Sequence, residues 1–345
     1  MKHLKTLGLL VIASIMLHAC KTDVNYEDQE KGNHIIAFYN VENLFDTIDD
    51  PTIRDEEYTP GAKVSWTRER YKQKLKNIAR AISTIDDNKL PEIIGLCEVE
   101  NKYVVFDLIH EEPLNKPGYS LIHKNSPDER GIDVALLFNP RFFKPVDAEF
   151  IPLSFPFDTT EKTRDVLYVK GIISSDTLHV FVNHWTSRWG GQQETEEFRV
   201  HTAGFLSGYV DSLNTVLDNP NILMMGDFND NPDNISLAET LDAKLVERNI
   251  NKEALYNMSW DLYDQGKGTL YWKSWDMFDQ FIVSGNLLRQ KKGLRITPYK
   301  QFIHKPDWIL FEDKNGVKRP SRTKGRNTYY GGYSDHLPVF VYLSP

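Results

Sequence analysis

Four short stretches of the chain place carboxylates, carboxamides or an imidazole directly after apolar runs. They are residues 40–44 (NVENL), 96–101 (LCEVEN), 225–231 (MGDFNDN) and 332–338 (GYSDHLP). Polar residues at strand ends form sites more often than they form cores. Carboxylate and carboxamide oxygens are ligands of hard divalent cations, and an acid beside an imidazole suits both metal ligation and proton transfer. Together the four stretches indicate a metal-assisted acid–base site.

The third stretch carries an acid and an amide two residues apart. On an extended segment Asp227 and Asn229 point to the same side and converge on one small volume. The spacing also resembles the start of an EF-hand calcium loop, but Pro232 stands where that loop requires Gly, and its twelfth position is Ala238 instead of Glu. We therefore interpret Asp227 and Asn229 as polar groups directed at one water or phosphate oxygen.

Two further stretches have the same character. Residues 183–188 (NHWTSR) follow an apolar run and contribute His184, and Asp279 enters the run 278–284. Each stretch alone has a simpler explanation, because Glu98 can be an exposed acid at a strand end and an Asp-His pair is often a polar turn. Their shared position at strand ends favours a single site.

The elements that must position these side chains appear as short apolar runs. Several are apolar on both faces, which indicates strands in a covered sheet. The expected strands are 35–41, 92–97, 132–138, 166–173, 178–183, 222–226, 278–284 and 339–343. Apolar positions three and four residues apart predict helices over 66–86, 194–217 and 101–112. Strands and helices alternate without a linker or repeat, so we expect one layered α/β domain over residues 34–345, with long functional loops near 48–63, 255–275 and 289–330.

Composition limits what this domain can bind. The 345 residues include 41 Lys and Arg against 49 Asp and Glu, a net charge of −8, and two Cys. A hydrophobic content of 40% excludes a disordered chain, and two cysteines exclude a disulfide framework. The negative net charge gives no electrostatic basis for binding of nucleic acid over the whole protein surface. Any phosphate must therefore be bound by local groups.

The N-terminus is typical of an exported lipoprotein. Residues 1–19 predict a signal peptide, because Lys2 and Lys5 precede an uncharged apolar run at 7–17 that is too short to span a bilayer. The sequence LHAC at 17–20 resembles a bacterial lipobox, which implies lipidation of Cys20, followed by a polar tether to residue 33. The alternative is an ordinary signal peptide with an incidental cysteine. We expect a lipid-anchored protein of the bacterial cell envelope, at the outer membrane on its periplasmic or surface side.

In this order the motifs resemble those of the endonuclease/exonuclease/phosphatase superfamily, the metal-dependent phosphodiesterases and phosphatases that include DNase I-like and abasic-site endonucleases. The resemblance spans residues 35–343. It implies a four-layered α/β sandwich in which two central mixed β-sheets are flanked by helices (DNase I-like), with the site at one edge of the paired sheets. It also implies a hydrolase that acts on phosphate ester bonds.

The resemblance assigns metal and water roles to matching positions. It implies that Glu98 and Asn40 hold the divalent cation, with Glu42 as an additional ligand and Asp335 as a second carboxylate beside the metal. Asp227 would orient and deprotonate the attacking water.

Other matching positions would act on the phosphoryl group. Asn229 would support Asp227, and His336 would act on the phosphoryl group while Asp279 fixes its tautomer. His184, Arg130 and Arg188 would contact phosphate.

One position departs from the family pattern. Cys97 stands where a Gln usually precedes the glutamate. Because Cys97 alternates with Glu98 along the strand, we expect its thiol to face away into packing.

These residue types are sufficient for cleavage of a phosphate ester by in-line attack of water. An oxygen ligand set favours Mg²⁺, with Mn²⁺ or Ca²⁺ as alternatives. A phosphodiesterase or nuclease is the first interpretation. The alternatives are a phosphomonoesterase or lipid/inositol-phosphate phosphatase, and a non-catalytic surface binding module. The expected substrate is a nucleic acid, a nucleotide or a phospholipid/inositol-phosphate headgroup, and the lipid would attach the protein to the membrane. No obligate protein partner is evident, and we expect a monomer.

Two surface features are ambiguous in sequence. Residues 314–326 contain only basic charged residues and form either a solvated loop or a rim for a polyanion. The basic residues are Lys314, Lys318, Arg319, Arg322, Lys324 and Arg326. Trp185, Trp189, Trp272 and Trp275 lie near the motifs, where they either stack on a substrate or pack in the core.

Overall fold

The computed structural model describes residues 34–246, 249–289 and 292–345. The predicted signal peptide, Cys20 and tether lie outside the described residues. Among the helices that are described, none has the length and apolar composition needed to cross a bilayer.

One large sheet has the strand order β14-β18-β1-β2-β4-β3, with β15 also paired to β18. Its strands are β1 (His34–Leu44), β2 (Ile93–Val99), β3 (Ser120–His123), β4 (Asp133–Phe138), β14 (Arg295–Ile296), β15 (Phe302–Ile303) and β18 (Val339–Ser344). The central pair β1–β2 is parallel and the flanking pairs are antiparallel, so the sheet is mixed.

The other large sheet has the order β5-β6-β7-β8-β13-β10-β9. Its strands are β5 (Phe143–Ile151), β6 (Val166–Ile173), β7 (Asp176–His184), β8 (Ile222–Asp227), β9 (Ala243–Lys244), β10 (Leu255–Asn257) and β13 (Asp279–Ser284). It is also mixed, because β7 and β8 run parallel whereas β13 is antiparallel to β8.

Helices and single turns connect the strands of the two sheets. They are α1 (Arg68–Ser83), α2 (Lys102–His110), α3 (Gln192–Val216), the short α4 (Trp260–Asp264) and α5 (Asn286–Arg289), and the single turns η2 (Glu56–Tyr58), η3 (Ser236–Thr240) and η4 (Asp307–Ile309). Two small hairpins complete the fold: β11 (Leu270–Tyr271) with β12 (Trp275–Asp276), and β16 (Leu310–Glu312) with β17 (Lys318–Pro320).

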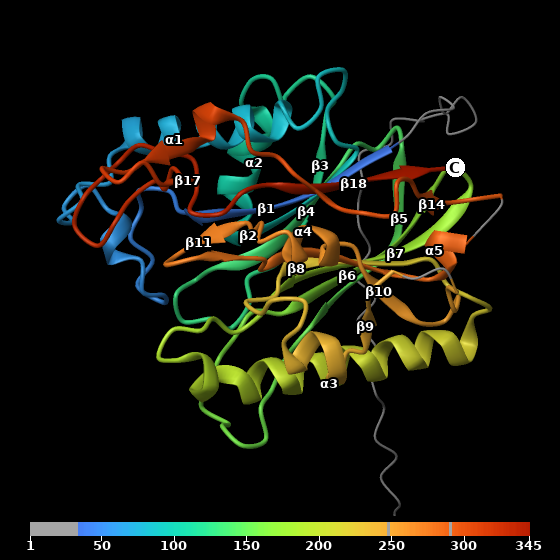
Figure 1. The fold of residues 1–345 in the computed structure, drawn as a ribbon. Coiled ribbons are helices and arrows are strands. Elements are labelled where there is room, and N and C mark those ends of the chain that lie inside the picture. The colour runs from blue at the N-terminus through green and yellow to red at the C-terminus, as the bar shows by residue number, and fades with distance from the viewer. Residues whose placement is uncertain (1–33, 247–248, 290–291) are drawn as a thin grey trace, which may run out of the picture.

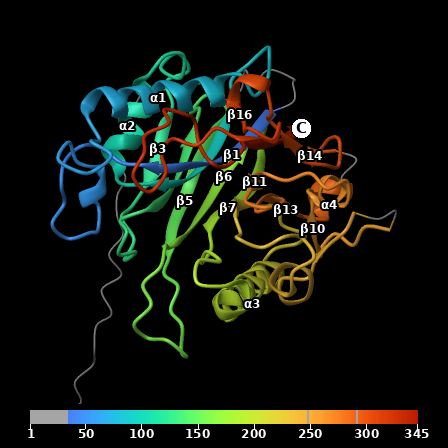
Figure 2. The same ribbon diagram turned by 60° about the vertical axis from the view of Figure 1, so that its left-hand side comes forward.

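The layers follow from strand periodicity. Along β1, Ile35 and Ala37 pack toward α1 and α2, whereas Ile36 and Phe38 enter the core between the sheets. A third cluster joins α3 to the outer face of the second sheet. The order is therefore helices, sheet, sheet, helix, with α1 and α2 on one side and α3 on the other (Figures 1 and 2). This confirms the predicted four-layered sandwich with two central mixed sheets.

The eight predicted strands and three predicted helices are all present, within a few residues of their expected ends. Ten of the strands in the described residues were not predicted, and β5 and β3 are the longest of them. In β5 most residues are at least partly exposed and Pro145 interrupts the pattern, and β3 is only half-buried, so neither strand forms an apolar run.

Candidate functional site

Several strands of the two sheets end at one edge of the sandwich. Asn40 and Glu98 lie at the ends of the parallel strands β1 and β2. In the facing sheet, His184 at the end of β7 is in register with Asp227 at the end of β8, which in turn pairs with Asp279 at the start of β13. Residues far apart in sequence therefore meet at one place, as the shared strand-end position predicts.

The backbone at this edge is unusual. Glu98 and Asn229 have left-handed φ values of 61° and 51°, and Glu42 and Asn43 have φ values of 49° and 52°. Non-glycine residues seldom adopt this conformation, and they do so mainly at functional sites. At Glu98 the pairing of β2 with β4 shifts register, so the bulge breaks the alternation of side chains.

Asn40 joins the two sheets. Its Nδ2 donates to Asp227 Oδ2 at 3.0 Å and to Glu98 Oε1 at 3.3 Å, and its Oδ1 accepts from the Glu42 backbone N–H. The other Glu98 oxygen accepts from the Asn43 N–H at 2.9 Å. A fully buried carboxamide thus fixes two carboxylates from opposite sheets side by side.

Asp227 lies at the centre of the group. Burial, reinforced by the nearby Asp279, raises the pKa of Asp227 to about 7, although His336 and two hydrogen bonds lower it. Asn229 donates its N–H to Asp227 Oδ1 at 2.9 Å and its side chain to the Trp185 carbonyl. Gly226 permits the close approach of β7, because a Cβ there would lie 2.5 Å from the Asn183 carbonyl oxygen.

His336 is held between two acids. Its Nδ1 lies 2.7 Å from Asp279 Oδ2, and its Nε2 lies 3.7 Å from Asp227 Oδ2. Burial alone would lower the pKa of His336, but Asp279 and Asp227 outweigh it and hold the pKa well above its usual value. The imidazole is therefore charged at neutral pH and presents Nε2–H toward Asp227.

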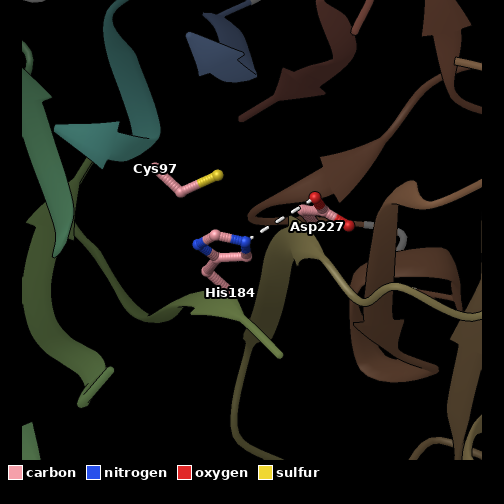
Figure 3. Close-up of side chains that lie close together, drawn as sticks. All are labelled: Cys97, His184 and Asp227. Atoms are coloured by element: carbon pink, nitrogen blue, oxygen red, sulfur yellow. Dashed lines mark ion pairs between the residues drawn. The ribbon is translucent and has the colours of Figure 1, made fainter. Parts of the chain in front are cut away.

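The pKa of His184 is shifted in the opposite direction from that of His336. The Nε2 of His184 lies 3.9 Å from both Glu98 Oε1 and Asp227 Oδ2, beyond hydrogen-bond distance, and its buried Nδ1 has no hydrogen-bond partner among the described residues. Burial, with a contribution from Arg164, lowers its pKa well below the usual value. Figure 3 shows the ring between Cys97 and Asp227. His184 is thus a neutral imidazole whose ring nitrogens form no hydrogen bond within the described residues.

Glu42 and Asp335 share a cation. Arg322 donates from Nε to Glu42 Oε1 and from an Nη to Asp335 Oδ2, both at 3.1 Å. Burial, with Asp335 next in weight, raises the pKa of Glu42 to about 7. The buried Lys74 of α1 holds the same loop through the Thr323 hydroxyl and the Tyr333 carbonyl. Either carboxylate would have to exchange or share Arg322 in order to bind a metal.

The two predicted phosphate-contacting arginines differ. Arg130 is exposed and donates to Asn43 Oδ1 at 2.8 Å. The backbone N–H of the same Asn43 donates to Glu98, so Asn43 links Arg130 to this carboxylate. Arg188 instead uses its guanidinium on the Asn229 carbonyl, Asp230, Asn234 and Gln192. Arg130 can turn toward a ligand, whereas Arg188 braces the loop that carries Asn229.

Cys97 does not simply face away. It belongs to the core between the sheets, yet its Sγ lies within 4.8 Å of ligand atoms of His184 and Asp227. The alternation on which the expectation depended ends at Glu98, where the bulge brings both side chains to the same edge.

The structure shows which of the tryptophans near the motifs are exposed and which residues of the basic segment 314–326 are paired with acids. Trp185 is buried, whereas Trp189 and Trp272 are 90% and 73% exposed. Trp272 follows β11, whose Leu270 pairs with His336. In the basic segment Arg322, Lys324 and Lys318 pair with acids. The segment therefore presents less free positive charge than its composition indicates.

The donor set fits a hard divalent cation. Glu98 and Asp227 bring carboxylate oxygens together around the Asn40 carboxamide, which presents Nδ2 to them and would have to turn over to offer its oxygen to a cation. The buried Asp279 Oδ1 has no hydrogen-bond partner in the described part of the chain. Crowded acids raise one another's pKa unless a cation neutralises them. Glu98 and Asn40 would hold that cation.

Sequence reasoning missed the residues that support the cluster. Ser334 donates to the Asn40 carbonyl and accepts from the His336 N–H, and Arg322 bridges Glu42 and Asp335. Ser334 lies inside the GYSDHLP stretch, which was a usable signal. The pairing of Arg322 with Glu42, 280 residues away, has no counterpart in the sequence pattern.

Comparisons with known proteins agree with this architecture. Residues 35–345 match the Endonuclease/Exonuclease/phosphatase family. No curated protein matches the sequence significantly. Similar solved structures include the mannosyl-6-phosphatase of Bacteroides thetaiotaomicron (TM-score 0.56, 16% identity, covering 90% of this chain and 100% of that one). The human Nocturnin catalytic domain with bound sulfate is also similar (TM-score 0.53, 18% identity, covering 90% of this chain and 94% of that one). So is a humanized D. rerio TDP2 (TM-score 0.53, 12% identity, covering 91% of this chain and 99% of that one). At these identities the structural likeness establishes the fold.

Proposed function

The chain belongs to the endonuclease/exonuclease/phosphatase family of phosphoesterases, and from that premise we propose that it is a divalent-metal-dependent phosphodiesterase that hydrolyses its substrate by in-line attack of water. The observation that carries the proposal is the convergence on Asp227 Oδ2. Asn40 Nδ2 lies 3.0 Å from this oxygen, His336 Nε2 3.7 Å and His184 Nε2 3.9 Å.

The residues of the cluster have different roles in the proposed reaction. Asp227 orients a water and takes its proton, because burial keeps this carboxylate basic. The charged His336, held by Asp279, donates a hydrogen bond to a phosphoryl oxygen. Mg²⁺ or a similar cation held by Glu98 and Asn40 would supply charge neutralisation and orientation.

Most side-chain cations near the cluster are already engaged with acids. A monoester carries nearly two negative charges at neutral pH, whereas each phosphodiester carries one. Arg188 and Arg322 are both engaged with acids, and His184 is neutral. Arg130 and His336 remain to face the substrate, and their two charges accommodate either ester, so the diester assignment rests on the exposed aromatic residues described next.

The exposed Trp189 and Trp272 support a substrate larger than inorganic phosphate. Trp189 follows the braced Arg188, and Trp272 adjoins the strand that pairs with His336. Flat exposed indoles beside a phosphate site suit stacking on a base or another planar or apolar substituent.

A substrate screen tests the proposal. Purified protein is assayed with plasmid DNA, RNA, bis-p-nitrophenyl phosphate and p-nitrophenyl phosphate, with a chelator and then with Mg²⁺, Mn²⁺ or Ca²⁺. We expect cation-dependent turnover of a diester and incorporation of one heavy oxygen from labelled water into the product phosphate. Release of phosphate from monoesters alone would instead identify a phosphatase, and chelator-insensitive binding without turnover would identify a binding module.

A further inference from the structure

A second set of ligand atoms lies beside the proposed catalytic group. Cys97 Sγ, a ring nitrogen of His184 and a carboxylate oxygen of Asp227 lie within 4.8 Å of one another, and all three residues are buried (Figure 3). The proposed hydrolysis uses Asp227 and makes no use of the thiol.

Three strands from the two sheets build this set. Cys97 comes from β2, and His184 and Asp227 are register partners at the ends of β7 and β8. The bulge at Glu98 keeps Cys97 on the inner face and brings the following carboxylate to the same edge. The thiol is therefore fixed by the fold at the inner side of the site.

We propose that Cys97, His184 and Asp227 form a binding site for a soft divalent cation of the zinc class, and that its occupation inhibits the enzyme. The metal-binding part stands on these residues alone. The inhibition rests on the proposed function, because a cation bound to Asp227 would remove the carboxylate that orients the water.

The distances suit a tetrahedral cation. Zinc binds sulfur at about 2.3 Å and imidazole nitrogen at about 2.0 Å, so its ligand atoms lie about 3.3 to 3.8 Å apart. Side-chain movements of about 1 Å would bring atoms now within 4.8 Å to that spacing. Glu98 Oε1, 3.9 Å from His184 Nε2, is a neighbouring carboxylate oxygen that could supply a fourth ligand.

The chemistry of the ligands also favours zinc. His184 is more than nine-tenths buried, its Nδ1 has no hydrogen-bond partner among the described residues, and its Nε2 lies 3.9 Å from the nearest carboxylate oxygens, so its ring is available as a ligand. A thiolate selects zinc over magnesium, which prefers oxygen. Binding would form a metal–sulfur bond as the Cys97 thiol gives its proton to solvent.

Metal binding is measured first, without reference to turnover. The full chain with Cys20→Ser, which removes the other thiol, is freed of metal with a chelator and titrated with Zn²⁺ in a competition assay against a chromophoric chelator. Co²⁺ is added to a second sample as a spectroscopic probe. We expect one Zn²⁺ per chain and a thiolate-to-cobalt charge-transfer band in the near ultraviolet with the strong visible absorption of tetrahedral cobalt.

Variants then assign the site. Cys97→Ser in the same background should weaken Zn²⁺ binding at least about tenfold and lose the charge-transfer band. His110→Gln, at an exposed helix end, is the matched control and should bind as the parent does. With an active substrate, Cys97→Ser should keep its Mg²⁺-supported turnover and resist Zn²⁺.

The outcomes separate the two claims. Unchanged Zn²⁺ affinity in Cys97→Ser, or the absence of a sulfur–cobalt band in the parent chain, overturns the site. If Cys97→Ser does not fold, the cobalt spectrum of the parent chain still decides. Cys97-dependent Zn²⁺ binding together with no turnover of any phosphoester supports the site and contradicts the proposed function.

Discussion

His336 Nδ1 lies 2.7 Å from Asp279 Oδ2, although 57 residues separate them and they enter from different sheets. Asp279 starts β13 in one sheet, and His336 lies just before β18 in the other. The contact fixes the orientation of the ring and, together with Asp227, keeps the imidazole protonated on both nitrogens and charged. The sandwich therefore positions a proton donor across the seam between its sheets.

Asp279→Asn should disrupt this donor without disrupting the fold. An amide removes the charge that keeps His336 protonated and can hold the neutral ring in the wrong tautomer. General-acid contributions are about a hundredfold or more, so we expect kcat to fall by about that factor with a small change in KM. Asp276→Asn, three residues earlier, is the control, because Asp276 contacts Asn231 and not His336. Equal rates in the two variants would show that the contact has no catalytic role.

The sequence is most informative about strands and strand ends. The runs at 166–173 and 222–226 became β6 and β8 because apolar residues on both faces require a covered sheet. Asn40, Glu98, Asp227 and His336 could be grouped because strand ends meet at one edge. The direction of Cys97 could not be predicted, since it depends on a bulge at Glu98 that no residue type signals.

Trp272→Ala tests the role of the exposed aromatic rim. If the indole stacks on the substrate, KM for a nucleic-acid substrate should rise about five- to tenfold or more, while turnover of bis-p-nitrophenyl phosphate changes little. Tyr103→Ala, at an aromatic residue of α2 that is also largely exposed, serves as the control. Identical KM values for parent and Trp272→Ala would remove the stacking role.

Metal should stabilise the protein more at high pH than at low pH. The folded pKa values of Asp227 and Glu42 are raised from 3.8 and 4.5 to about 7, so the folded state holds more protons than the unfolded state across that window. The metal-free protein therefore loses stability as pH rises from about 4 to about 7. The pKa of His336 is also raised in the folded state, so this residue adds a further loss of stability as pH rises above the usual pKa of histidine.

Thermal unfolding with a chelator or with Mg²⁺ measures this dependence. The increase in Tm on adding Mg²⁺ should be larger at about pH 8 than at about pH 5.5, because protonated carboxylates do not bind the cation. Glu98→Gln should reduce the increase at both pH values. A Tm increase independent of pH would argue against a carboxylate metal site in this cluster.

Membrane attachment through Cys20 remains a proposal from the sequence. Cys20→Ala should move the protein from the membrane fraction to the soluble fraction after a salt wash, because the mature chain would lack its acyl anchor. Fractionation and immunoblotting in a bacterial host provide the measurement. Retention of the Cys20→Ala chain in washed membranes would exclude lipid anchoring as the means of attachment.

The most direct measurement is Mg²⁺-dependent hydrolysis of bis-p-nitrophenyl phosphate by the parent chain, Glu98→Gln and Glu100→Gln. Glu100 follows Glu98 by two residues but accepts from the Asp46 N–H, outside the cluster, so it is a matched control. Loss of the charged metal ligand should lower kcat/KM at least about a hundredfold in Glu98→Gln and leave Glu100→Gln within about threefold of the parent, with both variants folded by circular dichroism. A folded Glu98→Gln variant with a near-parental rate would contradict the assignment of this cluster as a metal-dependent phosphoesterase site.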